Sequence, residues 1–224
     1  MTQADLFIAP ILDLIAIPYV TKTMNATLFD KEPPTIYRGE PSPEVNAAWD
    51  ELIQVHTIAV DGAAISGIGK NRSRTARYPE SFNMGNDAHI AQIDVIHQIH
   101  CLDMLRRAVH RDYYRKEPTI HAYNVHNEHC LHLLLQNIMC TASVDMITYN
   151  WVDGQRLPFP DFNINKKCRD YDAIMGWHKD HHVDVEMYRV LHAPPDAVVE
   201  HESMEFPGYG VDVTGLTATD IEVY

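Results

Sequence analysis

Residues 97–102 read His97-Gln-Ile-His100-Cys101-Leu102, and residues 126–131 repeat the pattern as His126-Asn-Glu-His129-Cys130-Leu131. The chain has 14 histidines and 4 cysteines among 224 residues. In a random arrangement of this composition, His-x-x-His-Cys would occur about 0.02 times. Chance is therefore a poor explanation for two copies.

Both motifs lie in segments with helical periodicity. Apolar residues recur at intervals of three and four over residues 89–114 and again over residues 124–142, which predicts two amphipathic helices. Because residues i, i+3 and i+4 share one face of a helix, each motif presents two imidazoles and one thiol on the same side. Each helix thus carries half of a metal-binding set.

The rest of the chain predicts shorter elements. A helix begins after Ser42, the expected N-cap, with Pro43 in the first position. Residues 145–165 predict a hairpin or an ordered loop, residues 170–190 a last helix, and residues 30–43 an extended segment. The expected fold class is mainly α: a helical core carrying the two motif helices, with Pro/Gly-rich loops and a small hairpin.

The length and composition predict one domain with flanking segments. We expect an N-terminal arm over residues 1–34, a catalytic domain over 35–190 and an acidic C-terminal tail over 191–224. With 18 basic and 31 acidic residues, the net charge is −13. This balance argues against nucleic acid as a partner, because phosphate binding requires a basic surface.

The N-terminal apolar run gives a conditional prediction of location. Pro10, Asp13 and Pro18 interrupt residues 6–20, which are too few for a membrane span of roughly 20 residues. The sequons at Asn25 and Asn71 predict a glycoprotein of the secretory lumen (endoplasmic reticulum or Golgi). In that case we expect an N-terminal targeting segment or anchor to be missing from this chain.

The four motif histidines form a nitrogen-rich donor set, which suits copper, zinc, iron or nickel. The cysteines leave alternatives open. They could serve as metal ligands, remain buried thiols or form two disulfides. If they form disulfides, the metal has only nitrogen ligands, and such a set favours copper. Cys130 and Cys140 are too far apart on one predicted helix to bond to each other. Two connectivities remain, namely Cys101–Cys130 with Cys140–Cys168, or Cys101–Cys140 with Cys130–Cys168.

A shared metal also constrains the connection between the motifs. If the first helix turned straight back after Tyr114, we expect His100 and His126 to lie at opposite ends of the hairpin. The prediction is therefore that residues 112–123 cross back in extended form, with two separate metal sites as the alternative.

The motifs and their surroundings resemble the UstYa-like family of fungal tailoring oxidases, which includes the ustiloxin-type oxidative cyclases and whose signature is a double His-x-x-His-Cys motif. The resemblance extends over residues 35–180. Its further segments are Tyr37-Arg-Gly-Glu-Pro-Ser-Pro-Glu-Val-Asn-Ala-Ala-Trp-Asp-Glu-Leu52 and Cys168-Arg-Asp-Tyr-Asp172 followed by Trp177.

The resemblance implies a copper-dependent oxidoreductase of fungal secondary metabolism, with dioxygen and in some members a halide as co-substrates. The implied reactions are oxidative cyclisation, hydroxylation, desaturation or halogenation of a peptide or polyketide-type scaffold. The copper ligands and catalytic residues would be His97, His100, His126 and His129. Family members are usually anchored or luminal and are thought to act in pairs, which implies a homodimer or a paired homologue.

Two positions depart from the family pattern. His132 replaces an expected acidic residue, and we treat it as a candidate extra ligand or halide-site residue. Lys166 replaces an expected histidine. Asp103 and Asp145 are candidates for orienting the imidazoles, although solvent-exposed positions on the helices are the favoured interpretation of both.

Other features carry weaker hypotheses. Aromatic residues could line the substrate pocket, a histidine cluster at a solvated helix end could bind adventitious metal, and a basic loop over residues 70–77 could attract an acidic ligand. A zinc hydrolase lacks its motif here, because Glu128 gives His-x-Glu-His and not His-Glu-x-x-His. A non-catalytic partner subunit, stabilised by metal or disulfides, is the alternative function. The aromatic and histidine candidates are Tyr113, Tyr114, Tyr149, Trp151, His178, His181 and His182.

Overall fold

The computed structural model describes residues 11, 15–25, 35–53, 57–114, 120–150, 152–194 and 197–198. Within these ranges the chain combines helices with three two-stranded antiparallel sheets. The mainly α assignment and the domain boundaries remain predictions for the chain as a whole. The α-helices are α2 (Pro43–Leu52), α3 (Gly62–Gly67), α4 (Asp94–Val109), α5 (Arg111–Tyr114), α6 (Ile120–Thr141), α7 (Tyr171–His181) and α8 (Val185–Arg189). The 3-10 helices are η2 (Ile36–Arg38) and η3 (Glu80–Phe82), and the strands are β1 (Tyr19–Thr23), β2 (Ile58–Val60), β3 (His89–Ala91), β4 (Thr148–Asn150), β5 (Phe159–Asp161) and β6 (Asn165–Arg169).

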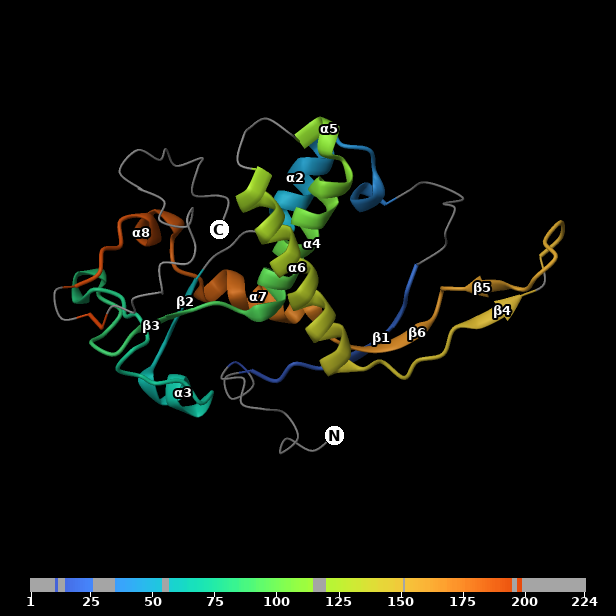
Figure 1. The fold of residues 1–224 in the computed structure, drawn as a ribbon. Coiled ribbons are helices and arrows are strands. Elements are labelled where there is room, and N and C mark those ends of the chain that lie inside the picture. Colours follow the sequence, from blue (N-terminus) through green and yellow to red (C-terminus); the bar gives the residue numbers. More distant parts are fainter. Residues whose placement is uncertain are drawn as a thin grey trace.

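The helices α4 and α6 form the centre of the molecule and carry the two motifs (Figure 1). They pack against each other along an apolar seam. Cys101, Met104 and Cys130 are its buried residues, with partly buried leucines around them. This seam fixes the motif faces toward one another.

The two helices run antiparallel, and this corrects the expectation for their connection. The His97 ring lies beside His129, and the His100 ring beside His126. The two members of each pair are equidistant in sequence from Tyr113, which lies in α5 between the two helices. Residues that are equally far from a helical turn stand opposite each other in a hairpin, so the expected separation of His100 and His126 was wrong. An extended crossover over 112–123 is also wrong, since α5 and the start of α6 occupy part of that segment.

Helix α2 begins as the sequence predicts. The Ser42 hydroxyl accepts a hydrogen bond from the Val45 backbone N–H at 3.2 Å, and Pro43 occupies the first helical position. The Trp49 side chain is buried, and α2 packs against α4. This helix therefore supports the motif pair from the side of α4.

The predicted last helix is broken in two. His182 adopts an extended backbone conformation with φ −69° and ψ 152°. The next residue, Val183, donates its backbone N–H to the Thr57 carbonyl at 2.7 Å. This long-range hydrogen bond ends α7 and places α8 in a second apolar cluster with Tyr78 and Ala88, a contact that local periodicity does not encode.

The sheets lie around the helical pair. The predicted hairpin over residues 145–165 is confirmed as β4 and β5, with Tyr149 opposite Pro160. The sequence did not predict β1, which pairs with β6 and extends to the same side as the hairpin (Figure 1), nor the pairing of β2 with β3. The predictions for the rest of the N-terminal arm and for most of the acidic tail fall outside the described residues. No helix in the described part of the chain has both the length and the apolar character to cross a membrane.

Candidate metal centre

The four motif imidazoles form a closed ring of neighbours between α4 and α6. Centroid separations are 6.2 Å between His97 and His100, 5.6 Å between His100 and His126, 6.4 Å between His126 and His129, and 6.0 Å between His129 and His97. The two halves predicted from the sequence thus converge on one place. The number of metal ions that this place holds stays a prediction.

The site is buried at one end and open at the other. His100 is 6% exposed, His97 and His126 are half-buried, and His129 is exposed to solvent. The Nε2 atom of His100 is buried and has no hydrogen-bond partner. A buried ring nitrogen without a partner is costly unless something binds it, so the deep end of the site fits a metal ion.

The electrostatics favour the protonation state that binds metals. Burial lowers the pKa of His100, and the nearby His126 and His97 imidazoles lower it further. Burial likewise lowers the pKa of His126, with His129 and His97 adding to the effect. Both side chains are therefore neutral at neutral pH, which is the form that coordinates a transition metal.

The motif cysteines lie beside the imidazoles. Ligand atoms of His97, Cys101 and His129 all lie within 4.8 Å of one another, and the Cys101 Sγ is 3.9 Å from the His97 Nε2. Burial raises the pKa of the Cys101 thiol, and burial together with the Cys101 thiol raises the pKa of Cys130 to about 12. All four cysteines are free thiols in the structure, and the disulfides stay a prediction.

His132 lies outside the ring of imidazoles. Its side chain is exposed on α6, and both of its ring nitrogens are 3.3 Å from the Gln136 Nε2. None of the ring contacts among the motif histidines of the described residues includes His132. Its role as an extra ligand stays a hypothesis.

Asp103 is buried, which corrects the expectation of a solvent-exposed position. It is 1% exposed and accepts hydrogen bonds from the Nε atoms of Arg106 and Arg107, each at 2.6 Å. The Arg106 guanidinium also donates to the Tyr114 hydroxyl at 2.6 Å and lies 5.1 Å from the Trp49 ring centroid. Asp103 therefore joins α4 to α2 and α5 and does not bond to an imidazole.

The sequence reasoning missed this network, although its spacing was visible. Arg106 and Arg107 follow Asp103 at i+3 and i+4, where side chains meet on a helix. The Tyr114 hydroxyl extends the network to Asn46 of α2, to which it donates a hydrogen bond at 2.5 Å. Only the packing of α2 on α4 makes this a buried site.

Asp145 and Lys166, two further positions singled out in the sequence, form an ion pair with each other. Lys166 lies 3.1 Å from the Asp145 carboxylate and donates to the Ser143 hydroxyl at 3.1 Å. Neither side chain contacts the motif imidazoles in these interactions. The Lys166 departure from the family pattern thus provides an ion pair between β6 and the segment that follows α6.

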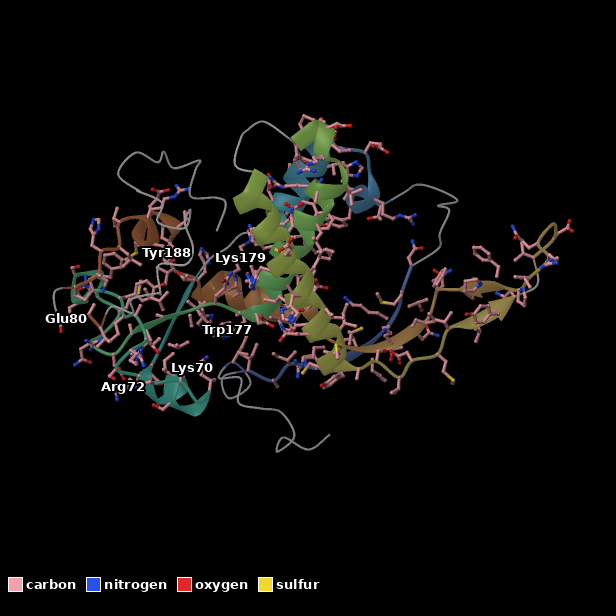
Figure 2. The ribbon with its side chains drawn as sticks, viewed as in Figure 1. Lys70, Arg72, Glu80, Trp177, Lys179 and Tyr188 are labelled. Carbon is pink, nitrogen blue, oxygen red and sulfur yellow. The ribbon has the colours of Figure 1, made fainter. Side chains whose placement is uncertain are left out.

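The weaker candidates lie elsewhere. Tyr113 and Tyr149 are exposed, at 47% and 64%, and Trp151 is outside the described residues. His178 is buried, contrary to the solvated helix end that the sequence suggested, whereas His181 stacks on Trp177 at 4.3 Å. In the basic loop, Arg72 pairs with Asp87 at 2.7 Å, and Figure 2 shows Lys70 and Arg72 near α3, well away from α6.

The family model for the mycotoxin biosynthesis protein UstYa matches residues 2–181. The chain belongs to the UstYa family. Among curated relatives of this family, the UstYa family oxidase aprY of Aspergillus flavus is 40% identical over 85% of this chain and 60% of its own length. The UstYa family oxidase phomYc of Diaporthe leptostromiformis is 29% identical over 64% of this chain and 58% of its own length.

One relative is named a chlorinase and not an oxidase: cctP2 of Talaromyces islandicus. It is 26% identical over 79% of this chain and 59% of its own length. This UstYa-family chain thus spans about 60% of the length of the relatives it matches. No solved structure matches it.

Proposed function

We propose that this chain is a copper-dependent oxidative tailoring enzyme of fungal secondary metabolism that acts on C–H bonds of a peptide or polyketide-type scaffold. One observation carries the proposal: the two motifs place four imidazoles in one closed ring with a buried, unpartnered nitrogen at its deep end. The relatives named above are oxidases and a chlorinase, which supports this class of reaction.

Both motif helices would supply ligands to the metal ion. His97 and His100 of α4 and His126 and His129 of α6 would be its ligands, and copper, when bound, supplies one-electron chemistry with dioxygen. The buried end at His100 excludes water from one side. The exposed end at His129 leaves the opposite side accessible to dioxygen and substrate. The lowered pKa values of His100 and His126 keep these ligands neutral.

The reaction outcome is proposed as oxidative cyclisation, hydroxylation, desaturation or halogenation. A chlorinase among the relatives supports halide use as one of these outcomes. The exposed His132, in place of the acidic residue of the family pattern, is the candidate that would favour an anion near the open end. His132→Asp, assayed with and without chloride, is expected to reduce any chlorinated product; an unchanged product spectrum would exclude His132 from halide use.

Metal analysis with electron paramagnetic resonance tests the copper site. We expect stoichiometric copper and a Cu(II) spectrum with several nitrogen ligands in the wild-type protein, and loss of that spectrum in His126→Ala. The matched control is His181→Ala, an exposed histidine of α7 that stacks on Trp177, and it should keep the spectrum. Stoichiometric zinc, or a His126→Ala spectrum like that of the wild type, would overturn the proposal.

A non-catalytic partner subunit remains the second candidate function. It is favoured by a run of exposed apolar side chains on α6, beside the metal centre: Leu131, Leu135, Ile138 and Met139 are 52–68% exposed. Exposed apolar side chains at helical spacing are typical of a surface that another chain covers. A homodimer or a paired homologue is therefore proposed as partner, and light scattering of the purified protein, alone and with a coexpressed homologue, checks it.

We also propose a location in the lumen of the secretory pathway. Both sequon asparagines, Asn25 and Asn71, are exposed and thus accessible to glycosylation. The Asn71 side chain accepts hydrogen bonds from the Ser73 backbone and hydroxyl at 3.0 and 2.8 Å, which forms a surface turn. Glycosidase-sensitive mass at Asn71 in protein from a fungal host would support this location, and unmodified asparagines would contradict it.

A further inference from the structure

The two motif cysteines meet in the core between α4 and α6. Cys101 and Cys130 are both 0% exposed and belong to one packed cluster with Met104. They lie close enough that the Cys101 thiol helps to raise the pKa of Cys130. Their packing in one cluster places a helix-to-helix covalent link within reach, next to the metal ligands.

The Cys101 sulfur has two competing neighbours. The first is Cys130, in the same packed cluster. The second is the pair of ligand nitrogens of His97 and His129, which lie within 4.8 Å of the sulfur and of each other. One sulfur cannot form a disulfide and coordinate a metal as a thiolate at the same time. The chemical state of this pair therefore decides whether the metal centre contains sulfur.

We propose that Cys101 and Cys130 form a redox-controlled disulfide that sets the donor set of the metal centre. As a disulfide, the pair links α4 to α6 and leaves four imidazoles as donors; as thiols, it adds the Cys101 sulfur to His97 and His129. In the oxidation the two S–H bonds break and one S–S bond forms. The two electrons and two protons pass to a disulfide oxidant such as oxidised glutathione, which becomes two thiols. The inference rests on the proposed metal function of this site.

The proposal also selects one of the two connectivities that the sequence left open. Cys140 lies ten residues after Cys130 on α6, roughly 15 Å along the helix axis, and its side chain is exposed. Cys101 is fully buried beside Cys130 and cannot reach Cys140 without unpacking the seam. The pairing of Cys101 with Cys140 is thereby excluded.

Peptide mapping tests the link on the intact protein without metal or turnover. The chain is equilibrated in a glutathione redox buffer, its free thiols are alkylated, and it is digested without reduction. We expect a linked peptide pair containing Cys101 and Cys130, also in the matched control Cys140→Ser. A Cys101–Cys140 link, or alkylation of both motif cysteines under oxidising conditions, would overturn the proposal.

Metal loading tests the change in donor set. We expect Co²⁺ to give a thiolate-to-metal charge-transfer absorption in the reduced protein, and this absorption to be lost after oxidation. Cys130→Ser removes the disulfide partner and should keep the absorption under both conditions. Absence of the absorption in reduced protein and in Cys130→Ser would refute the sulfur switch. The peptide map is read without any metal, so it can fail or succeed independently of the copper proposal, which fails on metal content and the spectrum of His126→Ala.

Discussion

Asp103→Ala should be among the most destabilising single changes in the described part of the chain. The Asp103 carboxylate is 1% exposed, and each of its oxygens accepts one guanidinium N–H at 2.6 Å. Removing one partner of a buried ion pair leaves the other charge uncompensated, which costs about 3–5 kcal/mol.

The surroundings place the expected cost near the lower end of that range. Arg106, with a side chain 10% exposed, keeps the Tyr114 hydroxyl and the Trp49 ring as partners. Arg107 is 33% exposed and keeps Asp50 at 3.3 Å. We therefore expect Asp103→Ala to lower the free energy of unfolding by about 3 kcal/mol. Asp103→Asn retains an acceptor and should cost less.

Urea unfolding followed by circular dichroism measures this free energy by linear extrapolation. Asp50→Ala is the matched control, because this carboxylate is 60% exposed and pairs with the same Arg107. An exposed pair is worth about 1 kcal/mol or less. If Asp103→Ala costs no more than Asp50→Ala, Asp103 is not a buried anchor between α4 and α2, and the reasoning is refuted.

Three further outcomes follow from the described contacts. Because the pKa values of His100 and His126 are lowered from their ordinary value of 6.5, the unfolded state binds more protons below that pH. The free energy of unfolding of the metal-free protein should therefore fall as the pH drops below 6.5. In urea melts at a series of pH values, a His100→Gln/His126→Gln variant should show a shallower fall. An equal dependence of the free energy on pH in both proteins would contradict this. Ser42→Ala removes the cap of α2 and should cost about 1 kcal/mol, whereas Thr35→Ala, a position without a side-chain cap, should be near neutral in the same assay. Lys166→Ala breaks a partly exposed pair with Asp145 and should cost about 1 kcal/mol or less while leaving the copper content unchanged; a loss of copper would place Lys166 at the metal.

The candidate site residues could be predicted from the sequence because the motif that identifies them is local. The spacing of His97, His100 and Cys101 puts three donors on one helix face whatever else the chain does. The same holds for the second motif. The sequence reasoning nevertheless misjudged how the two faces meet, because it placed the ends of a helical hairpin wrongly and so required an extended crossover that the structure does not contain.

The burial of individual side chains could not be predicted from local sequence patterns. Asp103 reads as a solvent-exposed residue by its type, and it becomes a buried anchor only because α2 covers that side of α4. The break in the last helix has the same origin, since the Thr57 carbonyl that receives the Val183 N–H comes from a segment far earlier in the chain. Long-range hydrogen bonds of this kind cannot be predicted from the spacing of apolar residues.

The sequence by itself determined the donor types, their helical faces and membership in a family with a double His-x-x-His-Cys motif. The tertiary structure decided that α4 and α6 run antiparallel, that four imidazoles form one ring, and that Cys101 meets Cys130 and not Cys140. The physical reason is that helical periodicity fixes the direction of a side chain relative to its own axis. The distance between side chains on two helices depends on how the apolar seam between them packs.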